Sequence, residues 1–347
     1  MGSKEGRRVP EDASTREEKT EARQRIVERI EGEAGIPGLV DILAEKLSPT
    51  DLQSLLLEVY ARRVRRRKPR EILDDYRAGR FVCPSASLPQ HLAVWDSLAW
   101  SMLPKDFVAL ELSPVAPLGT ISALAPLSQD WSVTTSRNSE VVSDATNVLA
   151  LEAAARRALQ MEDPSKGDSR VHLAASHRLL RGQKFGEGPG VRQHFRLFAL
   201  CSSGRDPGNL RFEVETALAH VEFFVRALHR YLGRSVSIRV AFADLGDPPH
   251  RHRLEDALVG VLAASGLPCQ VGWEESTSEG KAYYRDLRFH IYAKHPNMGE
   301  KELVDGGGVD WGAKLLNNGK ERMVISGLGS ERLAQLFDQD IGLGQRV

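Results

Sequence analysis

Hydrophobic residues along this chain follow two kinds of spacing. A helical stripe runs from Leu52 to Val59, directly after Ser48 and Pro49, which are typical of a helix start because Ser caps the helix and Pro suits its first turn. The longest helical stripe spans about 211–232. The pattern also predicts helices at about 90–102 and 253–265, and residues 17–31 are expected to form a charged, solvated helix.

Shorter apolar runs with strand-like character follow one another from residue 107 onward. They lie at about 107–112, 171–176, 195–201, 236–242, 268–273, 287–292 and 323–325. Hairpin-length or long loops join them rather than regular crossover helices, which favours an antiparallel sheet. The sequence therefore predicts an α+β fold, with an antiparallel sheet flanked by helices and a helical extension at the N-terminus.

The chain divides into three parts by composition. Residues 1–35 form a charged tail that we expect to be partly disordered, and residues 36–85 form a helical arm. The arm has a basic end at residues 61–70, which suits either the dipole of the preceding helix or a phosphate-binding patch. Residues 86–347 would form the folded core.

Charge and cysteine content narrow the class of protein. The 347 residues include 47 basic and 47 acidic side chains, so the formal net charge of zero gives no general attraction to nucleic acid or membrane. The three cysteines form neither a disulfide framework nor a set of zinc ligands. No apolar run approaches the ~18 residues of a membrane span, and the charged N-terminus is unlike a secretory signal. These features predict a cytoplasmic protein that does not associate with membranes.

A glycine-rich junction between a strand and a helix lies near the C-terminus. An apolar strand ending at Ile325 runs into Gly327 and Gly329, and a helix begins at Ser330 with Arg332 in its first turn. Glycine within a strand often marks close approach by a backbone or a ligand, and a guanidinium just beyond it can stack on a planar ring. An ordinary strand–turn–helix would give the same pattern.

This junction resembles motif 3 of class II aminoacyl-tRNA synthetases. The preceding Gly306-Gly307 and Asp310 resemble the Gly-Gly-Arg-Tyr-Asp segment of the histidyl-tRNA synthetase branch. Residues 95–114 resemble motif 1, a helix and a strand ending in Pro that form the dimer interface of these enzymes. The resemblance covers about residues 90–337 and implies a class II catalytic core that forms a homodimer.

Residues 171–205 resemble motif 2, a hairpin with a cationic, glycine-rich tip. The resemblance implies that Arg178 binds the α-phosphate of ATP, that Phe195 lies under the adenine, and that Arg332 covers the other face of the ring. Arg192, Gly327 and Gly329 would complete the nucleotide site, and Mg²⁺ would accompany the ATP. Arg178 and Arg332 would be the catalytic residues, with Arg178 stabilising charge on the α-phosphate. The alternatives are a surface Arg178 and a Phe195 that belongs to the core.

The substrate side of the site is identified by weaker resemblances. Asp144 and Thr146 stand where histidyl-tRNA synthetases have the acid and the Thr that bind the α-amino group of the substrate. Asp144 also suits a plain helix cap. Tyr283 and Tyr284 resemble the Asp-Tyr-Tyr stretch of the family, and they suit either the pocket or the core. No metal ligands are predicted.

Several positions depart from the family pattern. Leu180 replaces the motif 2 Glu, and Ala199 to Cys201 stand where acidic residues are expected. Glu279 and Ala282 replace the Arg and the Asp of the histidine site, so histidine specificity is not expected.

Two main functions remain open, with nucleic-acid binding through Arg62 to Arg70 as a third. One is an ATP-dependent ligase that activates a small amino-acid-like carboxylate as an acyl-adenylate and passes it to an acceptor other than tRNA. The other is a non-catalytic paralogue that binds a protein partner, as the regulatory subunit of ATP phosphoribosyltransferase does. The tRNA-handling domains of the family are not expected in this sequence, so no tRNA charging is predicted.

Overall fold

The computed structural model describes residues 13–85, 87–125, 127–163, 169–183, 193–233, 236–246, 250–275, 283–295, 297 and 299–337. Two compact units are present. The first comprises the chain up to Cys83 with Thr134–Ser139, and the second comprises Pro84–Val133 and the chain from Glu140 onward.

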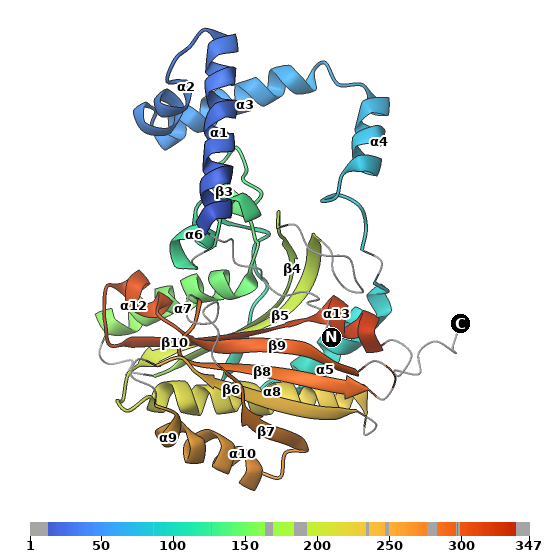
Figure 1. Ribbon diagram of the computed structural model, residues 1–347, viewed down its shortest axis with the longest axis vertical. Helices are drawn as coiled ribbons and strands as arrows, with labels where there is room; N and C mark the ends of the chain where they lie inside the picture. The colour runs from blue at the N-terminus through green and yellow to red at the C-terminus, as the bar shows by residue number, and fades with distance from the viewer. Residues whose placement is uncertain are drawn as a thin grey trace. The chain divides into compact units, whose positions relative to one another are not determined.

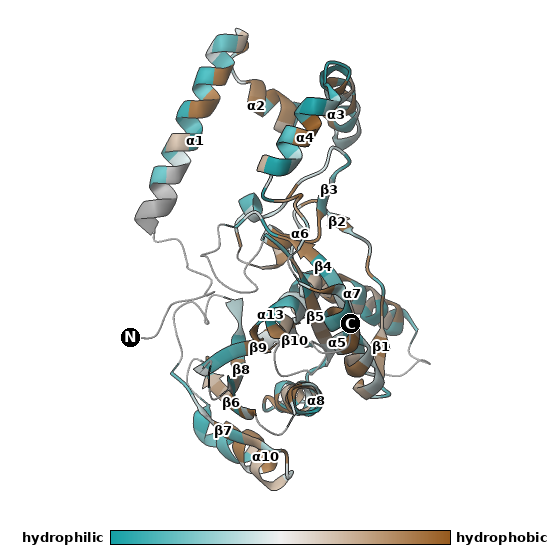
Figure 2. Cartoon of the chain, turned by 90° about the vertical axis from the view of Figure 1, so that its right-hand side faces the viewer, coloured by the Kyte–Doolittle hydropathy of each residue, from teal (hydrophilic) through white to brown (hydrophobic). Residues whose placement is uncertain are grey.

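The first unit is helical. Its helices are α1 (Ala13–Ala34), α2 (Leu39–Asp41), a π-helical turn (Ile42–Lys46), α3 (Pro49–Val64) and α4 (Pro69–Ala78). Helix α3 starts where the sequence predicted. Ser48 caps it, since its hydroxyl accepts a hydrogen bond from the Asp51 backbone N–H at 3.1 Å. Figure 2 shows α2 as largely hydrophobic and α1 as a mixture of hydrophilic and hydrophobic residues.

The second unit is built around an eight-stranded sheet with the order β1-β4-β5-β10-β9-β8-β6-β7. The strands are β1 (Phe107–Ala109), β4 (Val171–Leu180), β5 (His194–Arg205), β6 (Ser237–Asp244), β7 (Cys269–Trp273), β8 (Arg285–His295), β9 (Gly299–Val309) and β10 (Glu321–Gly329). Two short strands, β2 (Val115–Pro117) and β3 (Ser139–Val141), pair separately. The sheet confirms the predicted α+β class, although its outer pairs, β1 with β4 and β6 with β7, are parallel.

Helices cover both faces of the large sheet. The remaining helices of the second unit are α5 (Pro89–Met102), α6 (Thr120–Leu124), a 3₁₀ turn (Gln129–Trp131), α7 (Ala145–Glu162), α8 (Arg211–Leu232), α9 (Arg251–Leu254), a π-helical turn (Glu255–Gly260), α10 (Val261–Ala264), α12 (Trp311–Leu316) and α13 (Ser330–Phe337). Figure 1 shows α7 and α8 on opposite sides of the strands.

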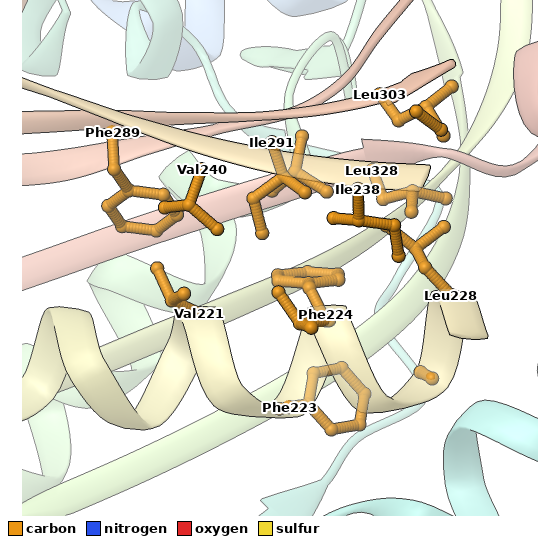
Figure 3. Packing of buried hydrophobic residues seen from close by; sticks show 14 of the residues in the cluster. Val221, Phe223, Phe224, Leu228, Ile238, Val240, Phe289, Ile291, Leu303 and Leu328 are labelled. Atoms are coloured by element: carbon orange, nitrogen blue, oxygen red, sulfur yellow. The ribbon is translucent and has the colours of Figure 1, made fainter. Parts of the chain in front are cut away.

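We call the side of the sheet covered by α8 the back face, and the opposite side, where α7 packs on β4 and β5, the front face. Ala174 and Phe198 belong to the apolar cluster of the back face, whereas their neighbours Ala175 and Ala199 belong to that of the front face. On the back face, Phe224 and other side chains of α8 pack against Ile291 and its neighbours (Figure 3).

The helix that resembles motif 1 differs from expectation at Trp95. We expected the large side chains of Trp95 and Trp100 to suit a dimer interface, but Trp95 is fully buried within α5. Its ring makes edge contacts with Phe198 and Tyr231, with centroid distances of 6.1 and 5.4 Å. Trp95 is therefore part of the back-face core, and an interface on α5 must use other residues.

Candidate functional site

The glycines of β9 allow close packing of three strands. A Cβ at Gly306 would lie 2.4 Å from the Phe289 ring, and one at Gly307 would lie 2.4 Å from the Leu287 carbonyl oxygen and 2.8 Å from Tyr284. All three contacts are shorter than those that real Cβ atoms make, so these positions require glycine. The Gly306-Gly307 pair is thus explained by packing within the sheet.

Arg178 lies at the end of β4 and points toward the back face. Its guanidinium contacts Glu331 Oε1 at 2.5 Å and His194 Nδ1 at 2.9 Å. The Glu331 carboxylate is buried at the start of α13 and also accepts a hydrogen bond from Ser85 at 3.0 Å. The expected phosphate-binding cation is therefore already paired with a carboxylate of the motif 3 helix.

Phe195 points toward the front face, away from Arg178. It pairs with Leu179 in the register of β4 and β5, and both residues belong to the front-face cluster. Side chains alternate between faces along a strand, so Arg178 and Phe195 lie on opposite faces of the hairpin. The structure does not bring these two residues together around one nucleotide.

His177 points toward the front face, as Phe195 does. Its register partner is Leu197. Burial is the main cause that lowers the pKa of His177, which disfavours its charged form. The front face therefore offers a neutral imidazole at this point rather than a fixed guanidinium.

Asp144 and Thr146 lie together at the start of α7, and both are buried. Asp144 Oδ1 accepts hydrogen bonds from the Thr146 backbone N–H at 3.0 Å and from its hydroxyl at 2.8 Å. Asp144 Oδ2 accepts a hydrogen bond from Arg181 Nη2 at 2.8 Å. Asp144 thus serves as the helix cap, and both of its oxygens are already bound.

Arg181 is the residue that the sequence interpretation missed. It is 8% exposed, donates to the Ser143 carbonyl oxygen at 2.7 Å, and lies over the Phe195 ring at 5.3 Å. Its guanidinium is bound to Asp144, the residue that we expected to receive the α-amino group of a substrate. The basic residues of the nearby glycine-rich loop indicated a cationic site. Nothing in the local sequence indicated that Arg181 pairs with Asp144.

Tyr283 and Tyr284 form an aromatic wall on the front face. Their rings are 4.8 Å apart, and the Tyr283 ring meets that of Trp311 edge-on at 5.6 Å. Both tyrosines are less than a tenth exposed. They lie in the same cluster as Ala199 and Cys201, so the front-face core fills the region where acidic nucleotide ligands were expected.

Arg332 lies in the first turn of α13, immediately after Gly327 and Gly329. Its Nε atom is buried and has no hydrogen-bond partner in the described part of the chain. A Cβ at position 327 would lie 3.2 Å from the Leu197 side chain, so close packing also favours glycine at this position. Arg192, Glu279 and Ala282 lie outside the described residues.

A charged network on β8 and β9 was not anticipated. His290 lies between Glu274 and Asp305, with its Nε2 3.3 Å from Asp305 Oδ1, and Arg288 also contacts Asp305 at 3.3 Å. Burial alone would lower the pKa of His290, but hydrogen bonds to Asp305 and Glu274 outweigh it and raise the pKa to about 9. These residues come from three separate segments of the chain, so no local sequence motif could predict the network.

Within the described ranges, no group of three or more His, Cys, Asp or Glu side chains is arranged to hold a metal ion. The helices that the structure describes include none that is long and apolar enough to cross a membrane.

Comparison with known proteins identifies the fold. The S. aureus histidyl-tRNA synthetase matches with a TM-score of 0.54 and 12% identity, over 75% of this chain and 70% of that chain. An ATP phosphoribosyltransferase regulatory subunit/histidyl-tRNA synthetase from Bacillus halodurans matches with a TM-score of 0.53 and 11% identity, over 73% and 82%. A histidine–tRNA ligase subunit from Alicyclobacillus acidocaldarius matches with a TM-score of 0.51 and 13% identity, over 74% and 95%.

Sequence comparison adds no closer assignment, because no protein-family model and no curated protein matches this chain. The structural likeness agrees with the motifs found near residues 95–114, 171–205 and 305–336. The second unit of this chain therefore has the fold of a class II aminoacyl-tRNA synthetase catalytic core and is similar in structure to the histidyl branch.

Proposed function

We propose that this chain is a non-catalytic paralogue of histidyl-tRNA synthetase that acts in the cytoplasm as a regulatory or partner-binding subunit. The observation that carries the proposal is the Arg181–Asp144 pair. Both oxygens of Asp144 are bound by groups of the chain itself, so the internal guanidinium takes the place of the ammonium group of a substrate.

Displacing Arg181 would be costly. Asp144 and Arg181 are 4% and 8% exposed, and breaking a buried pair leaves an uncompensated charge at a cost of about 3–5 kcal/mol. A substrate ammonium bound at Asp144 would have to offset that cost. The geometry thus favours a site that stays closed to amino acids.

The nucleotide half of the site supports the same proposal. Arg178 is paired with Glu331 on the back face, and the front-face positions near Phe195 are occupied by Leu179 and Leu197. An adenylating site needs fixed positive charge aimed at the α-phosphate. The guanidinium next to Phe195 is that of Arg181, which is bound to Asp144 and to the Ser143 carbonyl oxygen, so these described residues do not fit ATP and Mg²⁺ in the arrangement that motif 2 implied.

One observation favours the second candidate, the ATP-dependent ligase. Arg332 keeps a buried Nε without a hydrogen-bond partner in the described residues, and such a donor is usually satisfied by a ligand or water. In that case Arg332 and Phe195 would hold adenine, and an amino-acid-like carboxylate would be activated for transfer to an acceptor other than tRNA.

Calorimetric titration with ATP and Mg²⁺ separates the two candidates. We expect no binding to the wild type at millimolar ATP. Binding that Arg332→Ala or Arg178→Ala weakens tenfold to a hundredfold, as stacking and Arg–phosphate contacts of about 1–3 kcal/mol require, would support the ligase. Arg196→Ala is the matched control, because Arg196 pairs with Asp96 on the back face.

Neither candidate charges tRNA. We expect acid-precipitable aminoacylation of total tRNA to remain at background with any of the twenty amino acids. Charging above background would contradict both the proposal and the alternative.

A further inference from the structure

A separate cavity lies beside the start of α8 and is lined from α8, α9, β8 and β10. Its volume is about 540 Å³, which falls within the range of small-molecule sites. It shares no lining residue with the candidate site described above.

The backbone around this cavity is unusual. Five residues other than glycine have a positive φ in the described chain, and three of them line the cavity: Asn209 at 56°, Leu210 at 58° and Asp286 at 57°. A register shift in the pairing of β8 with β9, between Arg285 and Arg288, places Asp286 in a bulge. Strained residues and bulges cluster at ligand sites, where they redirect side chains.

One part of the cavity is rich in carboxylates. Asp206 and Asp286 line the cavity together with the guanidinium of Arg322, which contacts Asp206 at 2.6 Å and also Glu213 Oε1, not itself part of the lining, at 3.2 Å. Glu213 Oε2 is buried without a partner in the described residues. The Asp286 side chain likewise forms no hydrogen bond or ion pair there, so this part of the cavity suits a positively charged group.

The lining also includes an unpaired cation and an apolar surface. In the described part of the chain, the Arg253 guanidinium makes no hydrogen bond or ion pair, and none joins it to Asp286. Leu210, Val214 and Leu254 supply apolar lining. The cavity therefore presents a separate anion, a separate cation and hydrocarbon to one ligand.

We propose that this cavity binds a free α-amino acid with an apolar side chain. Asp286 receives the ammonium group, Arg253 receives the carboxylate, and Val214 with Leu254 contact the side chain. The site is independent of Asp144 and would serve as an effector site rather than as a catalytic one.

The test is calorimetry on the full chain with L-leucine, L-methionine and L-valine. We expect at least one to bind, and we expect its amide, which lacks the carboxylate, and its deamino acid, which lacks the ammonium, to bind at least about tenfold more weakly. This comparison uses wild-type protein, so it does not depend on how well a variant folds.

Substitutions then locate the site. Asp286→Asn, in which Asn tolerates the positive φ, and Arg253→Gln should each weaken binding about tenfold or more. Arg251→Gln should leave it unchanged, because Arg251 lies on the same helix but does not line the cavity. Absence of binding at millimolar amino acid, equal binding of the amide and the acid, or binding unaffected in folded Asp286→Asn and Arg253→Gln would overturn the proposal.

Discussion

At the scale of single residues, His290 makes stability depend on pH in a defined direction. Its pKa is raised to about 9 against an ordinary value of 6.5, because Glu274 and Asp305 favour the imidazolium. A raised pKa gives stability that is fully present below the unfolded pKa and is lost as pH rises through the folded one. We expect His290 to stabilise the protein at pH 6 by on the order of 3 kcal/mol and to contribute nothing at pH 10.

Urea unfolding at pH 6 and pH 10 checks this expectation. The difference in unfolding free energy between wild type and His290→Gln should shrink at the higher pH. His252→Gln, which replaces an exposed histidine, should show no such change. A difference that is equal at both pH values would show that His290 is not held as a cation.

Single residues differ in how far local sequence determines their surroundings. A local motif predicted that a helix begins at Ser330 with Arg332 in its first turn. Helix α13 begins at that residue. The relation of Arg178 to Phe195 depends on strand register, and a shift of one residue moves a side chain to the other face. The Arg181–Asp144 pair joins residues 37 positions apart, and no periodicity in the sequence encodes such a contact.

At the scale of elements, the glycines of β9 set how closely β8 and β10 approach. Gly306→Ala would press a methyl group against Phe289 and against Ser326, whose Cβ would lie 2.6 Å away. We expect a loss of about 1–3 kcal/mol in unfolding free energy, measured by urea denaturation. Gly272→Ala in β7 is the matched control, since nothing lies within 4 Å of its Cβ. Equal effects of both substitutions would contradict the packing explanation.

A buried ion pair ties α7 to β10. Arg157 donates from Nε and Nη2 to the two oxygens of Glu321, each at 2.8 Å, and both side chains are 1% exposed. Arg157→Leu should cost about 3–5 kcal/mol because it leaves the Glu321 carboxylate buried and unpaired. The double substitution with Glu321→Leu should recover most of that loss.

The neighbouring residue provides the control for this pair. Arg156 forms a half-exposed pair with Glu152, so Arg156→Leu should change stability by less than about 1 kcal/mol. A double variant as unstable as Arg157→Leu alone would contradict the account of the pair.

Element prediction succeeded where apolar periodicity was strong. The expected helix at 211–232 is α8 with the same bounds, because its stripe faces a single core. The helix expected at 253–265 is also found, as an uninterrupted helical run over 251–264 that consists of α9, a π-helical turn and α10. Strand β9 was not predicted, since three consecutive glycines lack the side chains that mark a strand, and only their close contacts with neighbouring strands explain it.

At the scale of the whole molecule, we expect a homodimer formed through α5. Trp95 is buried in the core, but Val94, Leu98 and Met102 line an open apolar hollow of about 680 Å³ on the same helix. Light scattering should give twice the 38.4 kDa mass of one chain. Val94→Arg should yield monomers, whereas Leu159→Arg, at an exposed apolar position on α7, should not. A 38.4 kDa wild-type species at micromolar concentration would contradict this expectation.

If Arg181 closes the substrate site, the chain does not adenylate amino acids. ATP–pyrophosphate exchange can be measured with each of the twenty amino acids in the presence of Mg²⁺, with a histidyl-tRNA synthetase as the positive control. We expect no amino-acid-dependent exchange above the blank. Exchange that depends on one amino acid and is abolished by Arg332→Ala would contradict this expectation and would establish the chain as an AMP-forming ligase.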